Sequence, residues 1–167
     1  MESIVHPALI GIPYKLGGKD MRGADCIGVV TMWLRAEGFD VNYDDGHGPV
    51  NVDWWEKSPR RFMEALLEVG SVVRFQDLRK YDLLLLFGNQ QCIYPSSLAV
   101  MIDDRHILGS NESRGSFVEM LSMSIKDRFW GAIRLHGAEE NGLRSRAHGD
   151  RRRLKRRFRC VRCDSSI

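Results

Sequence analysis

The sequence predicts an α+β fold in which N-terminal helices pack on an antiparallel sheet of about five to six strands. Amphipathic helical patterns occupy the first 70 residues, and short apolar runs separated by turn residues follow from residue 71 onward. Helices that precede a series of short strands favour an α+β fold over a doubly wound one. The chain has 167 residues and is 43% hydrophobic, which is sufficient for one continuous core.

Two helices are expected before the strands. The first begins near Cys26 and ends at Gly38, because glycine commonly follows the last turn of a helix. Residues 40–57 are rich in turn formers and predict a loop. The second helix follows Ser58-Pro59, an N-cap residue with proline at the first helical position, and stops at Gly70. The apolar stripes of the two helices consist of Val29, Val30, Trp33 and Leu34, and of Phe62, Met63, Leu66, Leu67 and Val69.

Six short strands are expected in the second half of the chain. Their predicted ranges are 71–75, 83–87, 97–102, 106–110, 117–121 and 131–135. Asp103-Asp104-Arg105 is typical of a hairpin turn between the third and the fourth of these strands. The pattern therefore predicts mostly antiparallel pairing.

The formal net charge of +3 is the sum of two unlike parts. Residues 1–143 carry 15 basic and 20 acidic side chains, whereas residues 144–167 carry ten basic and two acidic ones. We expect one folded domain over 1–143 and a basic, arginine-rich tail over 144–167. No membrane span and no secretory signal are expected, and four cysteines are too few for a disulfide scaffold. The sequence thus predicts synthesis in a cytoplasm without export by the general secretory route.

The stretch that indicates chemistry is the glycine-rich segment from Gly11 to Gly23, followed by Asp25-Cys26 at the start of the first helix. Glycine allows a backbone to approach a ligand closely. A cysteine at a helix N-terminus lies at the positive end of the helix dipole, which favours the nucleophilic thiolate. The alternative is that Cys26 is a small apolar residue in the core, since free cysteine is among the most buried residue types.

The order Pro-Tyr, Gly-Gly and Gly-x-Asp-Cys-x-Gly-Val-Val closely resembles the motif of the NlpC-type family of papain-like cell-wall peptidases. The matching residues are Pro13, Tyr14, Gly17, Gly18, Gly23, Asp25, Cys26, Gly28, Val29 and Val30. The resemblance covers roughly residues 8–136. It is closest to the branch found in bacteriophage tail proteins, where a large apolar residue often follows the cysteine. Ile27 fits that branch, as does the ending Phe-Trp-Gly-Ala-Ile-Arg at residues 129–134.

The resemblance implies a papain-like, NlpC-type fold that cleaves peptide bonds in peptidoglycan through a cysteine nucleophile. On this basis Cys26 is the nucleophile position, Tyr14 lines the active site, and Asp25 precedes the nucleophile. The segment Tyr-Asp-Leu-Leu at residues 81–84 corresponds to the family's Gly-Asp-Leu-Val before the first core strand.

The family's acid–base pair is missing from the positions where we expect it. The family has a histidine base and a second histidine about twelve residues later, whereas Ser97 and Gly109 stand at these base and orienting positions. Serine cannot exchange a proton near neutral pH, and glycine cannot orient a side chain. His106 should pair near Ile102, on the order of 15 Å along the sheet from Ser97. His47, in the loop after the first helix, is the better candidate for a substitute base.

The basic tail leaves several interpretations open. It is a solvated segment, a docking segment that orders on an acidic partner, or a nucleic-acid-binding module. Cys160 and Cys163 form a CxxC pair, which is either two exposed thiols or half of a zinc or iron–sulfur site shared with a partner. The cationic residues expected to bind a partner are Arg151, Arg152, Arg153, Lys155, Arg156, Arg157 and Arg159.

Together these features predict a structural protein of a phage tail tip or hub, resident in the virion, on a peptidase fold with a degenerate site. Other tail proteins are its expected partners, and peptidoglycan peptides are the ligands that the resemblance implies. The first alternative is an active cysteine peptidase that opens the cell wall during genome entry. The second is a nucleic-acid-binding protein. None of these functions requires a cofactor.

Overall fold

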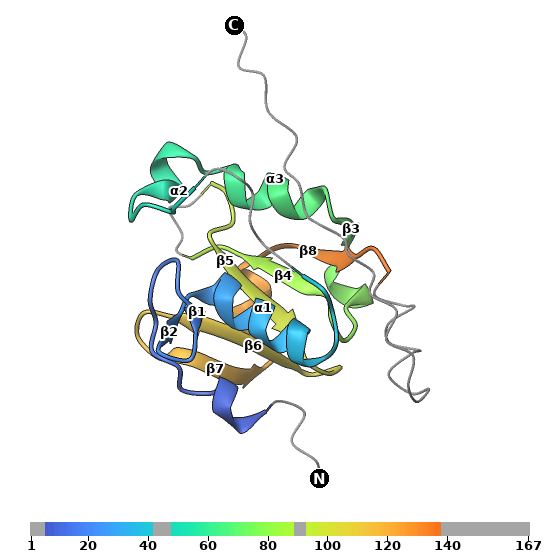
Figure 1. The fold of residues 1–167 in the computed structure, drawn as a ribbon. Helices are drawn as coiled ribbons and strands as arrows, with labels where there is room; N and C mark the ends of the chain where they lie inside the picture. Colours follow the sequence, from blue (N-terminus) through green and yellow to red (C-terminus); the bar gives the residue numbers. More distant parts are fainter. Residues whose placement is uncertain (1–5, 42–47, 89–92, 138–167) are drawn as a thin grey trace, which may run out of the picture.

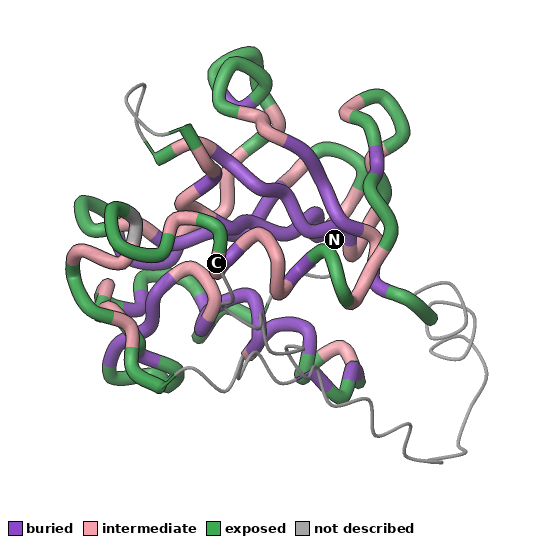
Figure 2. Tube along the Cα trace, turned by 90° about the horizontal axis from the view of Figure 1, so that it is seen from above, coloured by how far each residue is buried: buried purple, intermediate pink, exposed green. Residues whose placement is uncertain are grey.

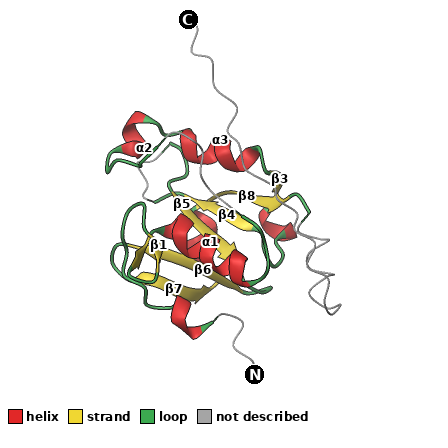
Figure 3. Cartoon of the chain, viewed as in Figure 1, coloured by secondary structure: helices red, strands yellow, loops and turns green. Residues whose placement is uncertain are grey.

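The structure, a computed structural model, describes residues 6–41, 48–88 and 93–137. It contains a six-stranded sheet in the order β3-β8-β4-β5-β6-β7, in which all neighbouring strands are antiparallel. Helix α1 lies against one face of this sheet (Figure 1), and the view coloured by secondary structure separates the helices from the strands (Figure 3). The predicted α+β class is therefore confirmed.

The described helices are α1 (Cys26–Ala36), α2 (Trp54–Lys57), α3 (Arg61–Leu67) and α4 (Met123–Asp127), with the 3-10 turns η1 (Pro7–Leu9) and η2 (Phe75–Asp77). A small hairpin, β1 (Lys19–Asp20) and β2 (Gly23–Ala24), precedes α1. The strands of the large sheet are β3 (Gly70–Val73), β4 (Leu83–Leu86), β5 (Ser97–Met101), β6 (His106–Asn111), β7 (Gly115–Met120) and β8 (Phe129–Leu135). In these described ranges, no helix has the length and apolar character needed to cross a membrane.

Local sequence accounts for both ends of α1. At its start, the Asp25 side chain accepts a hydrogen bond from the Gly28 N–H at 2.8 Å and caps the helix. At its end, Gly38 adopts φ 93°, and the N–H groups of Gly38 and Phe39 bond back to carbonyls of the last turn. The predicted apolar stripe is buried and consists of Val29, Val30, Trp33 and Leu34.

The region after α1 differs from the predicted loop and single helix. The end of the predicted loop forms α2, and Ser58 is the C-cap of α2 rather than the N-cap of the next helix. Pro59 explains this break, because proline disfavours helical backbone in the residue before it. Helix α3 then begins at Arg61 without a side-chain cap. Trp54 of α2 packs on Phe62 of α3, with ring centroids 5.9 Å apart.

The two faces of the large sheet bury separate apolar clusters. Strand side chains alternate between a cluster shared with α1 and a second cluster shared with α4. The cluster on the α1 side includes Leu83, Leu85, Leu98, Val100, Leu108 and Ile133. The cluster on the opposite side includes Leu84, Leu86, Ala99, Met101, Ile107 and Ile125. The middle of the sheet is thus covered on both faces, and buried residues run through it continuously (Figure 2).

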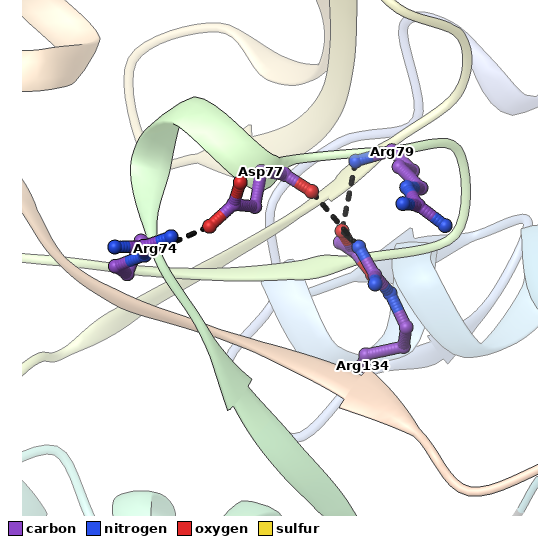
Figure 4. Close-up of polar contacts among 5 residues, drawn as sticks. Arg74, Asp77, Arg79 and Arg134 are labelled. Atoms are coloured by element: carbon purple, nitrogen blue, oxygen red, sulfur yellow. Dashed lines mark hydrogen bonds and ion pairs between the residues drawn. The ribbon is translucent and has the colours of Figure 1, made fainter.

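A buried carboxylate ties the loop before β4 to β8. Asp82 is 1% exposed, and Arg134 binds both of its oxygens, at 2.9 Å through Nε and at 2.8 Å through a terminal nitrogen. The Arg79 N–H adds a bond to Asp82 at 2.8 Å, and Arg134 also donates to the Asp77 carbonyl at 2.9 Å (Figure 4). Because a buried charge is tolerated only with such partners, Asp82 has a structural role here.

Candidate active site

The glycines of the motif pack the loop before α1 against the helix itself. A Cβ on Gly28 would lie 2.2 Å from the Gly18 carbonyl oxygen, and a Cβ on Gly18 would lie 2.3 Å from the Gly23 carbonyl oxygen. The close approaches that these glycines permit are therefore between the loop and α1, at Gly28, and within the loop, at Gly18. The sequence alone predicts a close approach to a ligand at these positions.

Asp25 links the same loop to the first turn of α1. One carboxylate oxygen accepts the Gly28 N–H and the other accepts the Gly17 N–H, each at 2.8 Å. The side chain is buried, and burial raises the pKa of its carboxyl despite these hydrogen bonds. Asp25 therefore acts as a cap and a clamp, which are roles in folding.

Cys26 is the first residue of α1 and stays partly exposed as a residue. The pKa of its thiol is raised to about 12, mainly by burial of the sulfur and further by the negative charge of Asp25. A backbone hydrogen bond from Leu98 lowers the thiol pKa, but it does not offset these causes. The backbone N–H groups of Cys26 and Ile27 at the helix start do lower the thiol pKa, as expected, but burial outweighs them. The cap that starts the helix also brings a negative charge to the sulfur.

Ser97 and Gly109 lie on the sheet face that turns away from α1. Ser97 pairs with Leu86, which belongs to the opposite cluster. Gly109 pairs with Ala99 of that same cluster, and a Cβ on Gly109 would lie 3.6 Å from the Ala99 Cβ. Directly paired residues point to the same face. Ser97 and Gly109 therefore point away from α1, and their assignment to the base and the orienting positions stays a prediction.

One residue further along each strand, Leu98 and Ser110 point toward α1. Leu98 is 1% exposed in the cluster that α1 shares, and its backbone is hydrogen-bonded to the Cys26 thiol. The Ser110 hydroxyl donates to the Ala24 carbonyl at 3.2 Å, two residues before Cys26. Leu98 and Ser110 are also twelve residues apart, as the family spacing requires. Leu98 thus belongs to the cluster against which Cys26 packs, and Ser110 contacts the chain two residues before Cys26.

The sequence carried little signal for this choice of face. Every residue from Leu98 to Ile102 is buried, because β5 is covered on both sides. A shift of one residue reverses the face of every side chain in a strand. A continuous apolar run shows no alternation that would expose such a shift. The one usable signal was Ser110, a polar residue directly after Gly109.

The described histidines make their contacts elsewhere. His106 Nδ1 lies 2.8 Å from a carboxylate oxygen of Asp103, and the Ile102 N–H donates to the His106 carbonyl, as the predicted pairing required. His6 accepts the Ala8 N–H at the start of η1, and His136 is exposed after β8. Within the described ranges, no histidine is hydrogen-bonded to the Cys26 thiol.

Tyr14 does lie beside the nucleophile position. Its pKa is raised to about 12 by burial and then by the charges of Cys26, Asp25 and Glu112. Tyr14 therefore keeps its hydroxyl proton at neutral pH and can donate a hydrogen bond. Glu112, from the turn between β6 and β7, was missed because nothing in its sequence context connects that turn with α1.

The other predicted site residues lie outside the described residues. They are the substitute base His47, the metal candidates Cys160 and Cys163, and the tail residues Arg151, Arg152, Arg153, Lys155, Arg156, Arg157 and Arg159. In the part of the chain that the structure describes, no group of three or more His, Cys, Asp or Glu side chains could hold a metal ion.

Solved structures share this fold. An NlpC/P60 family protein from Bacillus cereus ATCC 10987 is 23% identical with a TM-score of 0.53, over 75% of this chain and 36% of that one. A protein "similar to lipoprotein" of the NLP/P60 family from Staphylococcus aureus Mu50 is 16% identical with a TM-score of 0.50, over 77% and 38%. The NlpC/p60 domain of the peptidoglycan hydrolase SagA is 19% identical with a TM-score of 0.48, over 76% and 90%. No protein-family model and no curated protein sequence matches the chain.

The order of the strands and the cysteine at the start of the packed helix define an α+β protein with the papain-like NlpC/P60 fold. The particular similarity is to the NlpC/P60 family proteins from Bacillus cereus and Staphylococcus aureus, at identities that establish the fold alone. The chain spans little more than a third of the length of the first two structures.

Proposed function

We propose that this protein is a structural component of a bacteriophage tail, at the tail tip or hub, built on a cell-wall peptidase fold that no longer hydrolyses peptide bonds. One observation carries the catalytic part of the proposal. The strand position that faces Cys26 holds Leu98, an apolar side chain that is 1% exposed. An alkyl side chain there can neither take a proton from the thiol nor return one to a leaving group.

The state of the thiol supports the same conclusion. With its pKa raised to about 12, mainly by burial, Cys26 is almost entirely in the thiol form at pH 7. Ser110, on the second position that faces the thiol, already donates its proton to the Ala24 carbonyl. Neither group on the facing strands activates the nucleophile.

The tail role rests on the resemblance and on the distribution of charge. Ile27 and the ending at residues 129–134 are similar to the phage branch of the family, and residues 144–167 carry the excess of basic side chains. Docking of this basic segment on other tail proteins would hold the domain in the virion. Peptidoglycan peptides are the ligand class implied for the surface around Tyr14 and Asp25.

Hydrolysis of purified peptidoglycan tests the catalytic part. The full chain and its Cys26→Ala variant should both release soluble fragments at the rate of a buffer control. Fragment release by the unmodified chain that disappears in Cys26→Ala would show an active peptidase and contradict the proposal.

Protein composition of purified virions tests the structural part. Quantitative mass spectrometry should find the chain in mature particles at a fixed copy number relative to other tail proteins. A truncation after Leu143 should lower its incorporation while leaving the domain folded. Particles that never contain the chain would contradict a tail role.

A further inference from the structure

Strand β7 is the outermost strand on one side of the sheet, and its outer edge is only partly covered. Near its start, the Gly11 N–H donates to the Ser116 carbonyl and the Ser116 N–H donates to the Ile12 carbonyl, both at 2.9 Å. Toward the N-terminus the chain then turns into η1, which packs on α1 and is drawn below β7 in Figure 1. Strand-like coverage of the edge therefore stops at Ser116.

The alternation of hydrogen-bonding direction along β7 shows which of its remaining backbone N–H and carbonyl groups point away from β6. Since Ser116 directs its N–H and carbonyl outward, antiparallel alternation directs those of Glu119 toward β6 and those of Val118 and Met120 outward. The Leu121 N–H bonds inward to the hairpin turn before β6, in agreement with this phase. Among the described residues, no further backbone hydrogen bond reaches the outward groups of Val118 and Met120.

Val118 and Met120, which carry these backbone groups, have apolar side chains, and Val118 is partly buried against the α1-side cluster. Met120 is 63% exposed, and Met123, at the start of α4, is 67% exposed. Methionine is flexible and polarizable, and it is frequent on surfaces that pack against partners. We call Val118 and Met120, with their outward backbone groups, the β7 edge. An open strand edge with exposed apolar side chains is a template for another strand.

The charge of Glu119 determines which kind of strand can pair with the β7 edge. In a two-fold pairing of β7 with a second copy, the register that uses both Val118 and Met120 places Glu119 directly opposite Glu119. Each Glu119 has an Arg114 partner at 2.8 Å, but carboxylates opposite each other on paired strands remain unfavourable. A strand with a cation at that position avoids the repulsion.

We propose that the β7 edge binds an extended segment of another protein, which adds to the sheet as an antiparallel strand. This segment has Lys or Arg opposite Glu119 and apolar side chains beside Val118 and Met120. Main-chain hydrogen bonds supply the affinity, and alternate side chains supply the specificity. The inference goes beyond the proposed function and does not depend on the state of Cys26.

A synthetic peptide, acetyl-Thr-Val-Lys-Val-Thr-amide, tests the proposal with the full, isotope-labelled chain. In the free protein, the Val118 and Met120 amides should exchange with solvent quickly. Saturating peptide should shift their NMR signals and slow their exchange roughly tenfold or more. A peptide with Glu in place of Lys should bind about two- to fivefold more weakly.

A proline variant provides the matched control. Met120→Pro removes an outward N–H without breaking a bond to β6, so the domain should fold while peptide binding is lost. Val72→Pro makes the same change on β3, the opposite edge strand, where alternation from the Val69–His136 pair also directs the N–H outward. This variant should bind the peptide normally.

Three results would overturn the proposal: slow exchange of both amides in the free chain, no shifts at millimolar peptide, or binding that survives Met120→Pro. If Met120→Pro fails to fold, a peptide N-methylated at both valines replaces it as the test. This peptide lacks the donors and should not bind, and its binding would count against strand addition.

Discussion

The two ends of α1 differ in how well their surroundings match the NlpC-type motif and in the contacts that they make. The N-terminal end reproduces the family motif around Asp25-Cys26, yet the strand positions facing it are Leu98 and Ser110. The C-terminal end packs against Tyr81, from the loop before β4, where the motif that the sequence resembles usually has glycine. Tyr81 has φ 78°, a left-handed conformation that glycine adopts without strain.

Contacts of the Tyr81 side chain hold this unfavourable backbone in place. Its ring centroid lies 5.5 Å from that of Trp33 and 4.8 Å from that of Phe39, and its hydroxyl donates to Glu37 at 2.8 Å. Lys80 adds its ammonium group over the ring, at 4.7 Å, and an ion pair with Glu37 at 3.0 Å. The end at which Tyr81 differs from the motif that the sequence resembles is therefore densely bonded.

The difference separates residues that the fold requires from residues that chemistry requires. At the N-terminal end, Asp25 caps the helix, and Gly18 and Gly28 allow the loop to pack, so these residues are needed whether or not the thiol reacts. A base facing Cys26 has no such role in packing. Retention of the motif is thus no proof of catalysis.

The largest effect is expected from histidines placed on the side of the sheet that faces Cys26. Leu98→His with Ser110→His should lower the pKa of the Cys26 thiol by about two units or more, because an imidazolium next to the sulfur stabilises the thiolate. The rate of alkylation by iodoacetamide against pH measures this shift. In the unmodified chain the rate should still be rising above pH 9, because the thiol titrates near pH 12.

Ser97→His with Gly109→His is the matched control for this pair. It adds the same two rings, but on the opposite face, and should leave the thiol pKa unchanged. A larger shift from this control pair than from Leu98→His with Ser110→His would show that the assignment of faces is wrong. Circular dichroism of both variants verifies that each is folded.

A smaller effect is expected from a methyl group between the loop and α1. Gly28→Ala should lower the free energy of unfolding by about 2–3 kcal/mol, because its Cβ meets backbone that cannot move away cheaply. Gly109→Ala, whose Cβ meets only ordinary contacts from 3.5 Å outward, should change it by less than about 1 kcal/mol. Urea denaturation of both variants compares them. Equal stability would argue against a packing role for Gly28.

The smallest effect is expected at the other end of α1. Tyr81→Phe removes the hydrogen bond to Glu37 and should cost about 0.5–1.5 kcal/mol of unfolding free energy. Tyr94→Phe removes an exposed bond to Arg60 and should cost less, on the order of 0.5 kcal/mol. Neither should alter the alkylation profile of Cys26. A changed profile in Tyr81→Phe would show that the two ends of the helix are coupled.

Local sequence patterns predicted the secondary structure correctly where the interactions that determine it are between residues close together in the sequence. The start of α1 at Cys26, its end at Gly38 and the six strands were predicted, because caps, turn residues and apolar periodicity act over a few residues. At Ser58-Pro59 the predicted helix start was wrong, because the same two residues suit either the end of α2 or the start of α3. The local sequence there is compatible with two different helix boundaries.

The sequence carried the fold class, the cysteine at the start of the packed helix and the absence of histidine from β5. Folding decided which residues meet the sulfur. In a strand buried on both faces, Leu98 and Ser97 look equally suited to either side, and only pairing with β4 and β6 sets their direction. The ionisation of Cys26 was also a property of the folded chain. Burial and the Asp25 carboxylate raise its pKa, and neither distance nor burial can be read from the order of residues.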